Sequence, residues 1–238
     1  MSILEVRNLR AYYGPVEAIH GIDFHLEEGE IVALLGANGA GKTTTMRAIS
    51  RMIRTTGEIT WEGQPLTKMS THKVAALGVG HIPDGRGTFV GLTVEENLKL
   101  GTLARGKRDR DRAAEDLADI YRRFPVLDEM RARIAGALSG GQQQILAIAR
   151  ALLGRPRLLM FDELSLGLAP QITAEIFSRL AELRKEWDLT MLVAEQNVRQ
   201  SLAVADRAYV LDSGEIVAAG TPDELGQGDA VERAYLGQ

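Results

Sequence analysis

Nine consecutive residues, 36–44, constrain the fold of this chain more than any other segment. They read GANGAGKTT and satisfy the pattern G-x-x-x-x-G-K-[ST]. The apolar run Ile31–Leu35 precedes them, and an apolar-periodic segment extends behind them to Ile53. A strand, a glycine-rich loop and a helix in that order allow backbone N–H groups and the helix dipole to surround a phosphate. The sequence therefore predicts a P-loop within an α/β core.

Every residue of this loop is expected to lie against the phosphates of a nucleotide. The predicted phosphate-binding residues are Gly36, Ala37, Asn38, Gly39, Ala40, Gly41, Lys42, Thr43 and Thr44. We expect Lys42 to reach the β- and γ-phosphates and the hydroxyl of Thr43 to ligate Mg²⁺. The predicted cofactors are therefore ATP and Mg²⁺.

Two carboxylates follow a second apolar run. Residues 157–163 read RLLMFDE, and four consecutive apolar residues are typical of a strand that is buried on both faces. Ligands of open α/β sheets bind outside the carboxyl ends of the strands. We therefore expect Asp162 to ligate Mg²⁺ and Glu163 to act as the general base that orients or deprotonates the attacking water.

Apolar runs of strand length alternate along the chain with segments of helical length. The runs lie at residues 31–35, 79–82, 158–161 and 191–194. This alternation predicts an α/β fold with a mainly parallel sheet. Residues 208–211 and 215–218 flank a turn that contains Gly214, which adds an antiparallel β element.

The middle of the chain is patterned differently. From about residue 89 to residue 154 the pattern is helical, with the spacing of a capping box at Thr93 and Glu96 and a charged, alanine-rich stretch at 109–123 that ends before Pro125. We expect a single nucleotide-binding domain over 1–238. Its α/β core would comprise 1–88 and 155–238, and a helical subdomain would be inserted at about 89–154.

Composition argues against several other classes of protein. The net charge is −4 with dispersed Lys and Arg, which gives little support to a nucleic-acid surface. The absence of cysteine excludes a disulfide framework or a thiolate metal site. No run of 18 apolar residues occurs, and Glu5 and Arg7 interrupt any signal-peptide core. We expect a soluble globular protein that contacts a membrane only through a partner.

A second helix start that contains glycine lies at residues 138–144, which read LSGGQQQ. Ser139 is a natural N-cap, so the segment either caps its own helix and does nothing more or binds an anion. Two adjacent glycines weaken a first helical turn, and the close approach of another molecule would explain them. Ser139, Gly140, Gly141 and Gln142 are therefore candidates for a phosphate cradle without a lysine.

The glycine-rich loop, the LSGGQ segment and the strand with its two acids occur in an order that resembles the nucleotide-binding subunit of an ABC transporter over nearly the whole chain. The resemblance implies a head-to-tail dimer in which Ser139 and its glycines bind the γ-phosphate of ATP held by the other subunit. It also places Tyr13 where the family has an aromatic residue that stacks on adenine. The alternative for Tyr13 is an ordinary core or surface tyrosine.

Three positions depart from the common family pattern. Asp84, in HIPDGRGTF, replaces the glutamine of the Q-loop, and Gln196, in VAEQN, replaces the switch histidine. The segment SLGLAP at 165–170 lacks the D-loop aspartate. Together with LTVEENL, these segments resemble the ATPases of branched-chain amino acid importers of the LivF type. Leu164 stands where that group usually has proline.

These departures bear on the predicted chemistry. Asp84 keeps a carboxylate and is expected to ligate Mg²⁺ directly or through water. Gln196 can donate a hydrogen bond to a γ-phosphate but cannot carry a proton as histidine does. We therefore expect catalysis to rest mainly on Glu163, with Gln196 assisting.

The resemblance implies an ATP-hydrolysing subunit that powers an importer for branched-chain, hydrophobic amino acids from the cytoplasmic face of the membrane. Its expected partners are a second ATP-binding subunit, preferably a distinct one, transmembrane permease subunits and, indirectly, an extracytoplasmic solute-binding protein. Phe89, Val90 and Leu92 are candidate apolar anchors for a permease helix, or are buried locally. Two alternatives stay open: an ATPase for urea or amide import, and a nucleotide-dependent clamp without a transport role.

Overall fold

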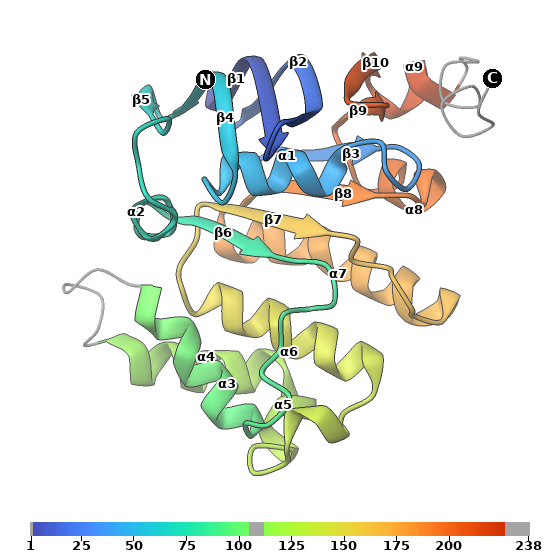
Figure 1. The fold of residues 1–238 in the computed structure, drawn as a ribbon. Helices are drawn as coiled ribbons and strands as arrows, with labels where there is room; N and C mark the ends of the chain where they lie inside the picture. Colours follow the sequence, from blue (N-terminus) through green and yellow to red (C-terminus); the bar gives the residue numbers. More distant parts are fainter. Residues whose placement is uncertain (1, 105–111, 227–238) are drawn as a thin grey trace.

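The computed structural model describes residues 2–104 and 112–226 as two β-sheets with helices between and beside them (Figure 1). Helix α1, Lys42–Ile49, lies between the two sheets, and helices of the middle section lie on the far side of the larger sheet. The α/β class predicted from the sequence is therefore confirmed.

The larger sheet has six strands in the order β10-β9-β3-β8-β7-β6. Their bounds are β3 Ile31–Leu35, β6 Val79–Ile82, β7 Leu158–Asp162, β8 Thr190–Glu195, β9 Arg207–Asp212 and β10 Glu215–Gly220. The pairs from β9 to β6 are parallel, and β10 pairs with β9 in the antiparallel sense. The predicted strands are confirmed, and β7 to β10 extend beyond their predicted ends by one or two residues.

The hairpin of β9 and β10 has the predicted turn. Ser213 and Gly214 both have positive φ, 46° and 84°, as the tight turns that match the twist of a hairpin require. The Gly214 N–H donates to the carbonyl oxygen of Ala40 at 2.9 Å. The turn thereby contacts the glycine-rich loop directly.

The smaller sheet was not predicted from the sequence pattern. Its order is β2-β1-β4-β5, all antiparallel, with β1 Ser2–Tyr13, β2 Val16–Glu27, β4 Arg54–Trp61 and β5 Gln64–Pro65. The pairing of β1 with β2 contains several register shifts, and Asn8 has a φ of 45°. Each shift interrupts the alternation of apolar and polar residues, so no long period of two marks β1.

The helices of the middle section pack against the opposite face of the six-stranded sheet. They are α3 Val94–Gly101, α4 Ala113–Arg123, α5 Pro125–Glu129 and α6 Gly140–Leu152, with 3₁₀ turns at Thr102–Ala104 and Ala135–Ala137. The capping box of Thr93 and Glu96 is confirmed, with both of its hydrogen bonds formed. The predicted helical stretch at 109–123 is helical from Ala113, and its first three residues lie outside the described part.

Four further helices complete the fold: α2 Thr71–Ala76, α7 Pro170–Trp187, α8 Val198–Leu202 and α9 Pro222–Gly226. The helix predicted to continue to Ile53 ends earlier, at Ile49, because Arg51 adopts a left-handed φ of 58° and the chain turns into β4. In the described part of residues 94–153 no strand occurs, apart from an isolated bridge that Ile134 makes with Thr93. The exact ends of the helical subdomain stay a prediction.

Alternate residues of the central strands enter two separate hydrophobic clusters. Leu158 and Met160 of β7 pack with α1 and the smaller sheet, whereas Leu159 and Phe161 pack with α3 to α7. The six-stranded sheet is therefore buried on both faces, as its continuous apolar runs predicted. Its carboxyl edge is where loops from β3, β6, β7 and β8 emerge together (Figure 1).

Candidate active site

The predicted phosphate loop joins β3 to α1 at that carboxyl edge. Gly39 and Gly41 have left-handed φ values of 86° and 111°, which favour glycine. A Cβ at Gly41 would also lie 2.6 Å from Cδ1 of Ile19. Gly41 is the N-cap of α1 and provides no side-chain cap, so the first-turn N–H groups of the helix face outward for an anion.

Lys42 is buried within the loop that it follows, with only 3% of its surface exposed. Its Nζ donates to the carbonyl oxygens of Gly36 and Ala37 at 2.9 and 3.0 Å. It also lies 3.8 Å from Oε1 of Glu163. Burial lowers the pKa of Lys42, and nearby carboxylates, Glu163 first, oppose that effect. The ammonium thus has carbonyl partners that a phosphate would replace.

Asp162 is the last residue of β7 and is almost fully buried. Its Oδ1 accepts a hydrogen bond from the Thr43 hydroxyl at 3.0 Å, whereas its buried Oδ2 has no hydrogen-bond partner among the described residues. Burial raises the pKa of Asp162 to about 6, although the bond from Thr43 lowers it. An unpaired carboxylate oxygen next to a hydroxyl fits a magnesium ion, which takes oxygen ligands.

The protein provides few other metal ligands at this edge. Within residues 2–104 and 112–226, no group of three or more His, Cys, Asp or Glu side chains is arranged to hold a metal ion. Mg²⁺ commonly retains several waters and combines one or two carboxylates with the phosphates of its substrate. The arrangement of Thr43 and Asp162 is suited to a metal that binds together with ATP.

Glu163 follows Asp162 in a strained backbone conformation. Its φ is 52°, a left-handed value that costs a residue other than glycine on the order of 1–3 kcal/mol. Its N–H donates to the carbonyl oxygen of Ala194 at 2.9 Å, and its own carbonyl accepts from the Leu166 N–H at 3.1 Å. Neighbouring strands therefore hold the predicted general base in a conformation that it would not adopt alone.

Asp84 and Tyr13 are connected through Arg47. One Arg47 nitrogen lies 3.9 Å from Oδ1 of Asp84, and another donates to the Tyr13 hydroxyl at 3.3 Å. Tyr13 ends β1 with 40% of its surface exposed, and the Asp84 side chain is half exposed. The sequence analysis missed Arg47, although its position four residues after Thr43 places both on one face of α1.

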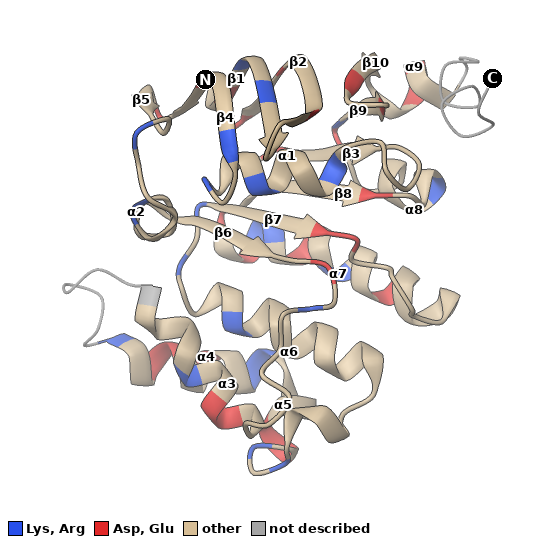
Figure 2. Ribbon diagram, viewed as in Figure 1, with Lys and Arg blue, Asp and Glu red and all other residues tan. Residues whose placement is uncertain are grey.

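Acidic residues gather at the carboxyl ends of β6, β7 and β8 (Figure 2). Gln196, the predicted partner of Glu163, is exposed directly after β8. Glu195, which the sequence analysis missed, precedes it and is 1% exposed. The rule that identified Asp162, an acid at the end of a buried strand, would also have identified Glu195.

The LSGGQ segment forms the start of α6. Ser139 is its N-cap: the Gln142 N–H donates to the Ser139 hydroxyl oxygen at 3.3 Å, and the Ser139 N–H donates to Oε1 of Gln142 at 2.9 Å. The hydroxyl of Ser139 accepts in this capping box and keeps its own proton as a donor. The N–H groups of Gly140 and Gly141 lie in the unpaired first turn of the helix.

The two glycines of this segment pack tightly against the same chain. A Cβ at Gly140 would lie 3.0 Å from an Arg86 nitrogen and 3.1 Å from Leu168, and one at Gly141 would lie 2.7 Å from Cγ2 of Ile172. Internal packing therefore supplies a reason for both glycines that the sequence argument did not include. Arg86, also missed, donates to the Gln143 side chain at 3.2 Å.

The chain alone does not bring all predicted site residues together. The side chains of α1 and α6 enter different hydrophobic clusters, on opposite faces of the six-stranded sheet. The glycine-rich loop, Thr43, Asp162 and Glu163 form one connected group, joined through Lys42 and the Thr43 hydroxyl. Ser139 to Gln142 form a second group, bordered by the segment 167–169 that follows Glu163.

Comparison with known proteins places the whole chain in one family. The family model described as ABC transporter matches residues 19–165. The chain is 40% identical to the high-affinity branched-chain amino acid transport ATP-binding protein BraG of Pseudomonas aeruginosa, over 99% of this chain and all of BraG. It is 35% identical to the probable branched-chain amino acid transport ATP-binding protein LivF of Archaeoglobus fulgidus, over 99% of each.

A further relative has export in its name. The lipopolysaccharide export system ATP-binding protein LptB of Haemophilus influenzae is 34% identical over all of this chain and 98% of its own. Among solved structures, a nucleotide-free ATP-binding cassette from an ABC transporter matches with a TM-score of 0.87 and 26% identity, each chain covered in full. A cassette in its ADP conformation matches with a TM-score of 0.87 and 27% identity, again over both whole chains.

Among the described residues, no helix combines the length and the apolar character that crossing a membrane requires. The matched family model, the full-length relatives and the connected phosphate-loop site agree with one another. The chain therefore belongs to the ABC transporter family, as an ATP-binding subunit that is an ATPase.

Proposed function

We propose that this ATPase powers the import of branched-chain amino acids. The observation that carries the proposal is the 40% identity to BraG, which extends over the full length of both chains. The segments SLGLAP and VAEQN, where the family pattern is altered, support the same assignment. The subunit would act at the cytoplasmic face of the membrane, together with permease subunits and a second ATP-binding subunit.

Three other functions compete with this one. Full-length identity of 34% to an LptB protein favours an exporter of a lipid-linked substrate. Import of urea or another amide is the second alternative, against which Asp84 counts. A clamp that binds nucleotide without transport is the third, suggested by Gln196 and by the missing D-loop aspartate.

The geometry supports a division of labour in hydrolysis. Lys42 exchanges its two carbonyl partners for β- and γ-phosphate oxygens, and the first-turn N–H groups of α1 complete the phosphate cradle. Glu163, 3.8 Å from the Lys42 ammonium, accepts the proton of the attacking water as general base. Gln196 donates a hydrogen bond to the γ-phosphate, and Tyr13 offers its exposed ring to adenine.

Thr43 and Asp162 are the residues that hold Mg²⁺ in this proposal. The unpaired Oδ2 of Asp162 and the hydroxyl of Thr43 would supply oxygen ligands, and Asp84 would contribute another directly or through water. The ion, when bound, neutralises the charge of the phosphates. Asp84 must leave Arg47 to do so, and their 3.9 Å separation makes that pairing a weak one.

The segment from Ser139 to Gln142 is proposed to complete the ATP site of a second subunit. The Ser139 hydroxyl can donate its proton while it accepts from Gln142, and the N–H groups of Gly140 and Gly141 have no partner within the helix. These donors and the positive end of α6 suit a γ-phosphate. Helices α1 and α6 pack against opposite faces of the sheet, so one chain does not bring its own two half-sites together. In this proposal a dimer joins them.

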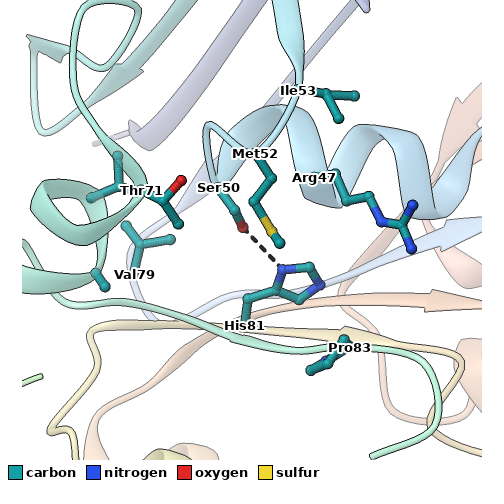
Figure 3. A pocket seen from close by; sticks show the side chains of 10 residues that line it. Arg47, Ser50, Met52, Ile53, Thr71, Val79, His81 and Pro83 are labelled. Carbon is teal, nitrogen blue, oxygen red and sulfur yellow. Dashed lines mark hydrogen bonds between the residues drawn. The ribbon is translucent and has the colours of Figure 1, made fainter. Parts of the chain in front are cut away.

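The surface beside β6 is the proposed contact with the permease. Phe89 and Val90 are 53% and 59% exposed, and Leu92 is partly buried. A cavity of about 420 Å³ has Phe89, His81 and Pro83 in its lining. A second cavity of about 470 Å³ shares His81 and Pro83 and lies between α1, α2 and β6, where His81 bonds to Ser50 at 3.0 Å (Figure 3). Burial, and then the nearby charge of Arg47, lowers the pKa of His81 to about 4, so its imidazole is neutral at physiological pH.

Transport in reconstituted vesicles tests the function. The tagged chain is purified from its own host together with the membrane subunits that accompany it. The complex is reconstituted into proteoliposomes, and ATP is supplied on the side of the membrane that the ATPase faces. We expect uptake of radiolabelled leucine and isoleucine that depends on ATP. Glu163→Gln should lower ATP turnover at least about 100-fold while nucleotide still binds.

The same assay separates the competing functions. Uptake of urea without leucine would replace the amino acid assignment, and extraction of a lipid-linked glycan from the vesicles would replace import by export. ATP binding with no hydrolysis, with or without the membrane subunits, would favour the clamp. Full turnover by the Glu163→Gln variant would remove Glu163 from the mechanism.

A further inference from the structure

The buried carboxylate of Glu195 holds together the two backbone segments that carry the proposed catalytic residues. Its Oε1 accepts from the Ser165 N–H at 2.7 Å, and its Oε2 accepts from the Ser165 hydroxyl at 2.8 Å. Oε2 also accepts from the N–H of Gln196 at 3.2 Å. One side chain therefore bonds both to Ser165, two positions after Glu163, and to the backbone of Gln196.

Position in the sheet explains why this contact matters. Glu163 has a left-handed φ of 52°, and its N–H bonds to the carbonyl oxygen of Ala194. Two residues further along the chain, the Ser165 N–H donates to the Glu195 carboxylate. The strained turn of Glu163 is thus held to β8 at two points, by the backbone bond from Glu163 and by the Glu195 carboxylate that accepts from Ser165.

A purely structural explanation for Glu195 is incomplete. A carboxylate that is 1% exposed is costly to bury, and burial raises its pKa despite the bonds from Ser165 that lower it. Lys42, the nearby cation, forms its ion pair with Glu163 and interacts with Glu195 only at longer range. An apolar residue would fill the same space in β8 at less cost but could not fasten Ser165 and Gln196.

We propose that Glu195 is a positioning residue for ATP hydrolysis, which fixes the turn that presents Glu163 and sets its register with Gln196. The proposal rests on the roles assigned above to Glu163 and Gln196. Glu195 does not touch the nucleotide in this scheme; it acts through Ser165 and through the Gln196 backbone. A change at Glu195 should therefore slow the hydrolytic step without a matching change in nucleotide binding.

Glu195→Gln is the decisive variant because it preserves size. An amide nitrogen in place of Oε1 would face the Ser165 N–H, and one in place of Oε2 would face the Gln196 N–H, so one backbone donor meets another donor in either orientation. We expect kcat for ATP to fall about tenfold or more, with KM changed less than about twofold. Ser165→Ala, which loses one bond of the three, should lower kcat less.

Glu30→Gln is the matched control. Glu30 lies near the opposite end of β3, is 13% exposed, and accepts from the Glu27 N–H at 2.8 Å and from Arg207. The same chemical change there should lower the melting temperature without lowering kcat. Combining Glu195→Gln with Ser165→Ala should reduce kcat no further than Glu195→Gln alone, because both changes act on one contact.

Hydrogen exchange gives a readout that does not depend on turnover. In Glu195→Gln the amides of Ser165 and Gln196 should exchange faster, while the amides of β3 keep wild-type rates. Wild-type kcat in a folded Glu195→Gln variant, or equal exchange at Ser165, would overturn the proposal and leave the ATPase assignment intact. Failure of the wild-type chain to hydrolyse ATP at all would instead count against the proposed function.

Discussion

The two glycine-containing helix starts of this protein, 36–43 at the start of α1 and 138–141 at the start of α6, look alike in sequence and differ in structure. In the first, Gly39 and Gly41 have left-handed backbones that shape the loop itself. In the second, Gly140 and Gly141 have ordinary helical backbones, and their missing side chains make room for Arg86, Leu168 and Ile172. Glycine therefore creates a conformation at one site and close packing at the other.

The comparison also weakens an argument from sequence. Adjacent glycines at a helix start predict the close approach of another molecule, yet contacts within the chain give Gly141, and less strictly Gly140, a second explanation. What still favours a ligand at Ser139 is the proton that its hydroxyl retains and the unpaired first-turn amides. The four predictions below separate these explanations, from the largest expected effect to the smallest.

Removing the lysine of the glycine-rich loop should have the largest effect. Lys42→Met keeps an apolar stem but loses the ammonium that is buried beside Glu163 and Asp162. We expect affinity for ATP to fall about 100-fold, the loss of strong charge-assisted bonds to phosphate. Titration with a fluorescent ATP analogue measures it. Equal binding by wild type and variant would show that backbone amides suffice to bind phosphate at residues 36–43. The segment at 138–141, which has no lysine, must rely on such amides.

Crowding Gly141 should separate packing from access. A Cβ there would lie 2.7 Å from Ile172, so Gly141→Ala should destabilise the chain by about 1–3 kcal/mol and lower hydrolysis while the loop at 36–43 still binds nucleotide. Ile172→Ala in the same chain provides room for the methyl group. Recovery of stability without recovery of hydrolysis would show that a partner's nucleotide needs the bare glycine. Recovery of both would show that packing was its only role.

The hydroxyl of Ser139 can be tested apart from its capping role. Ser139→Asp still caps α6, but it offers no proton and places a negative charge where a γ-phosphate would bind. We expect stability close to wild type with hydrolysis reduced at least about tenfold, whereas Ser139→Ala should also lose about 1 kcal/mol of stability. Thermal unfolding and ATPase rates measured on the same preparations check this. Unchanged hydrolysis in Ser139→Asp would leave the segment as a helix cap alone.

Protonation of Asp162 should affect the site at residues 36–43 and leave the segment at 138–141 unchanged. The pKa of Asp162 is raised to about 6 from 3.8, so the folded chain without metal is stabilised by this group at low pH and loses that contribution as pH rises through about 6. Asp162→Asn should therefore stabilise the metal-free protein at pH 7 by up to about 3 kcal/mol. Chemical denaturation at pH 4 and pH 7 measures the difference, which should shrink at the lower pH.

The same titration bears on metal binding. Because Asp162 is proposed to ligate Mg²⁺ as a carboxylate and not as a carboxylic acid, the gain in ATP affinity that Mg²⁺ provides should decline below about pH 6 and be smaller in Asp162→Asn. Variants of Ser139 should show the wild-type pH dependence. A pH-independent magnesium effect in the wild-type chain would mean that Asp162 is not a ligand.

Sequence reasoning succeeded where function and burial produce a local pattern. Continuous apolar runs predicted β3 and β6 with their bounds, and the rule that ligands bind beyond strand ends predicted that Asp162 lies at the carboxyl end of β7. It failed for β1, where register shifts interrupt the alternation, and for Arg47, whose partners Tyr13 and Asp84 come from distant parts of the chain. Ile172 of α7 packs against Gly141 of α6, and a pattern within one segment cannot predict a contact between two helices.

The folded-back position of Lys42 has a consequence for the end of the reaction cycle. When a nucleotide leaves a buried lysine, the ammonium would ordinarily remain without a partner in a low-dielectric site, and this raises the barrier to departure. Here the carbonyls of Gly36 and Ala37 receive it at 2.9 and 3.0 Å. In the proposed mechanism, the loop therefore carries an internal substitute for its own ligand, which would lower the barrier to the release of ADP.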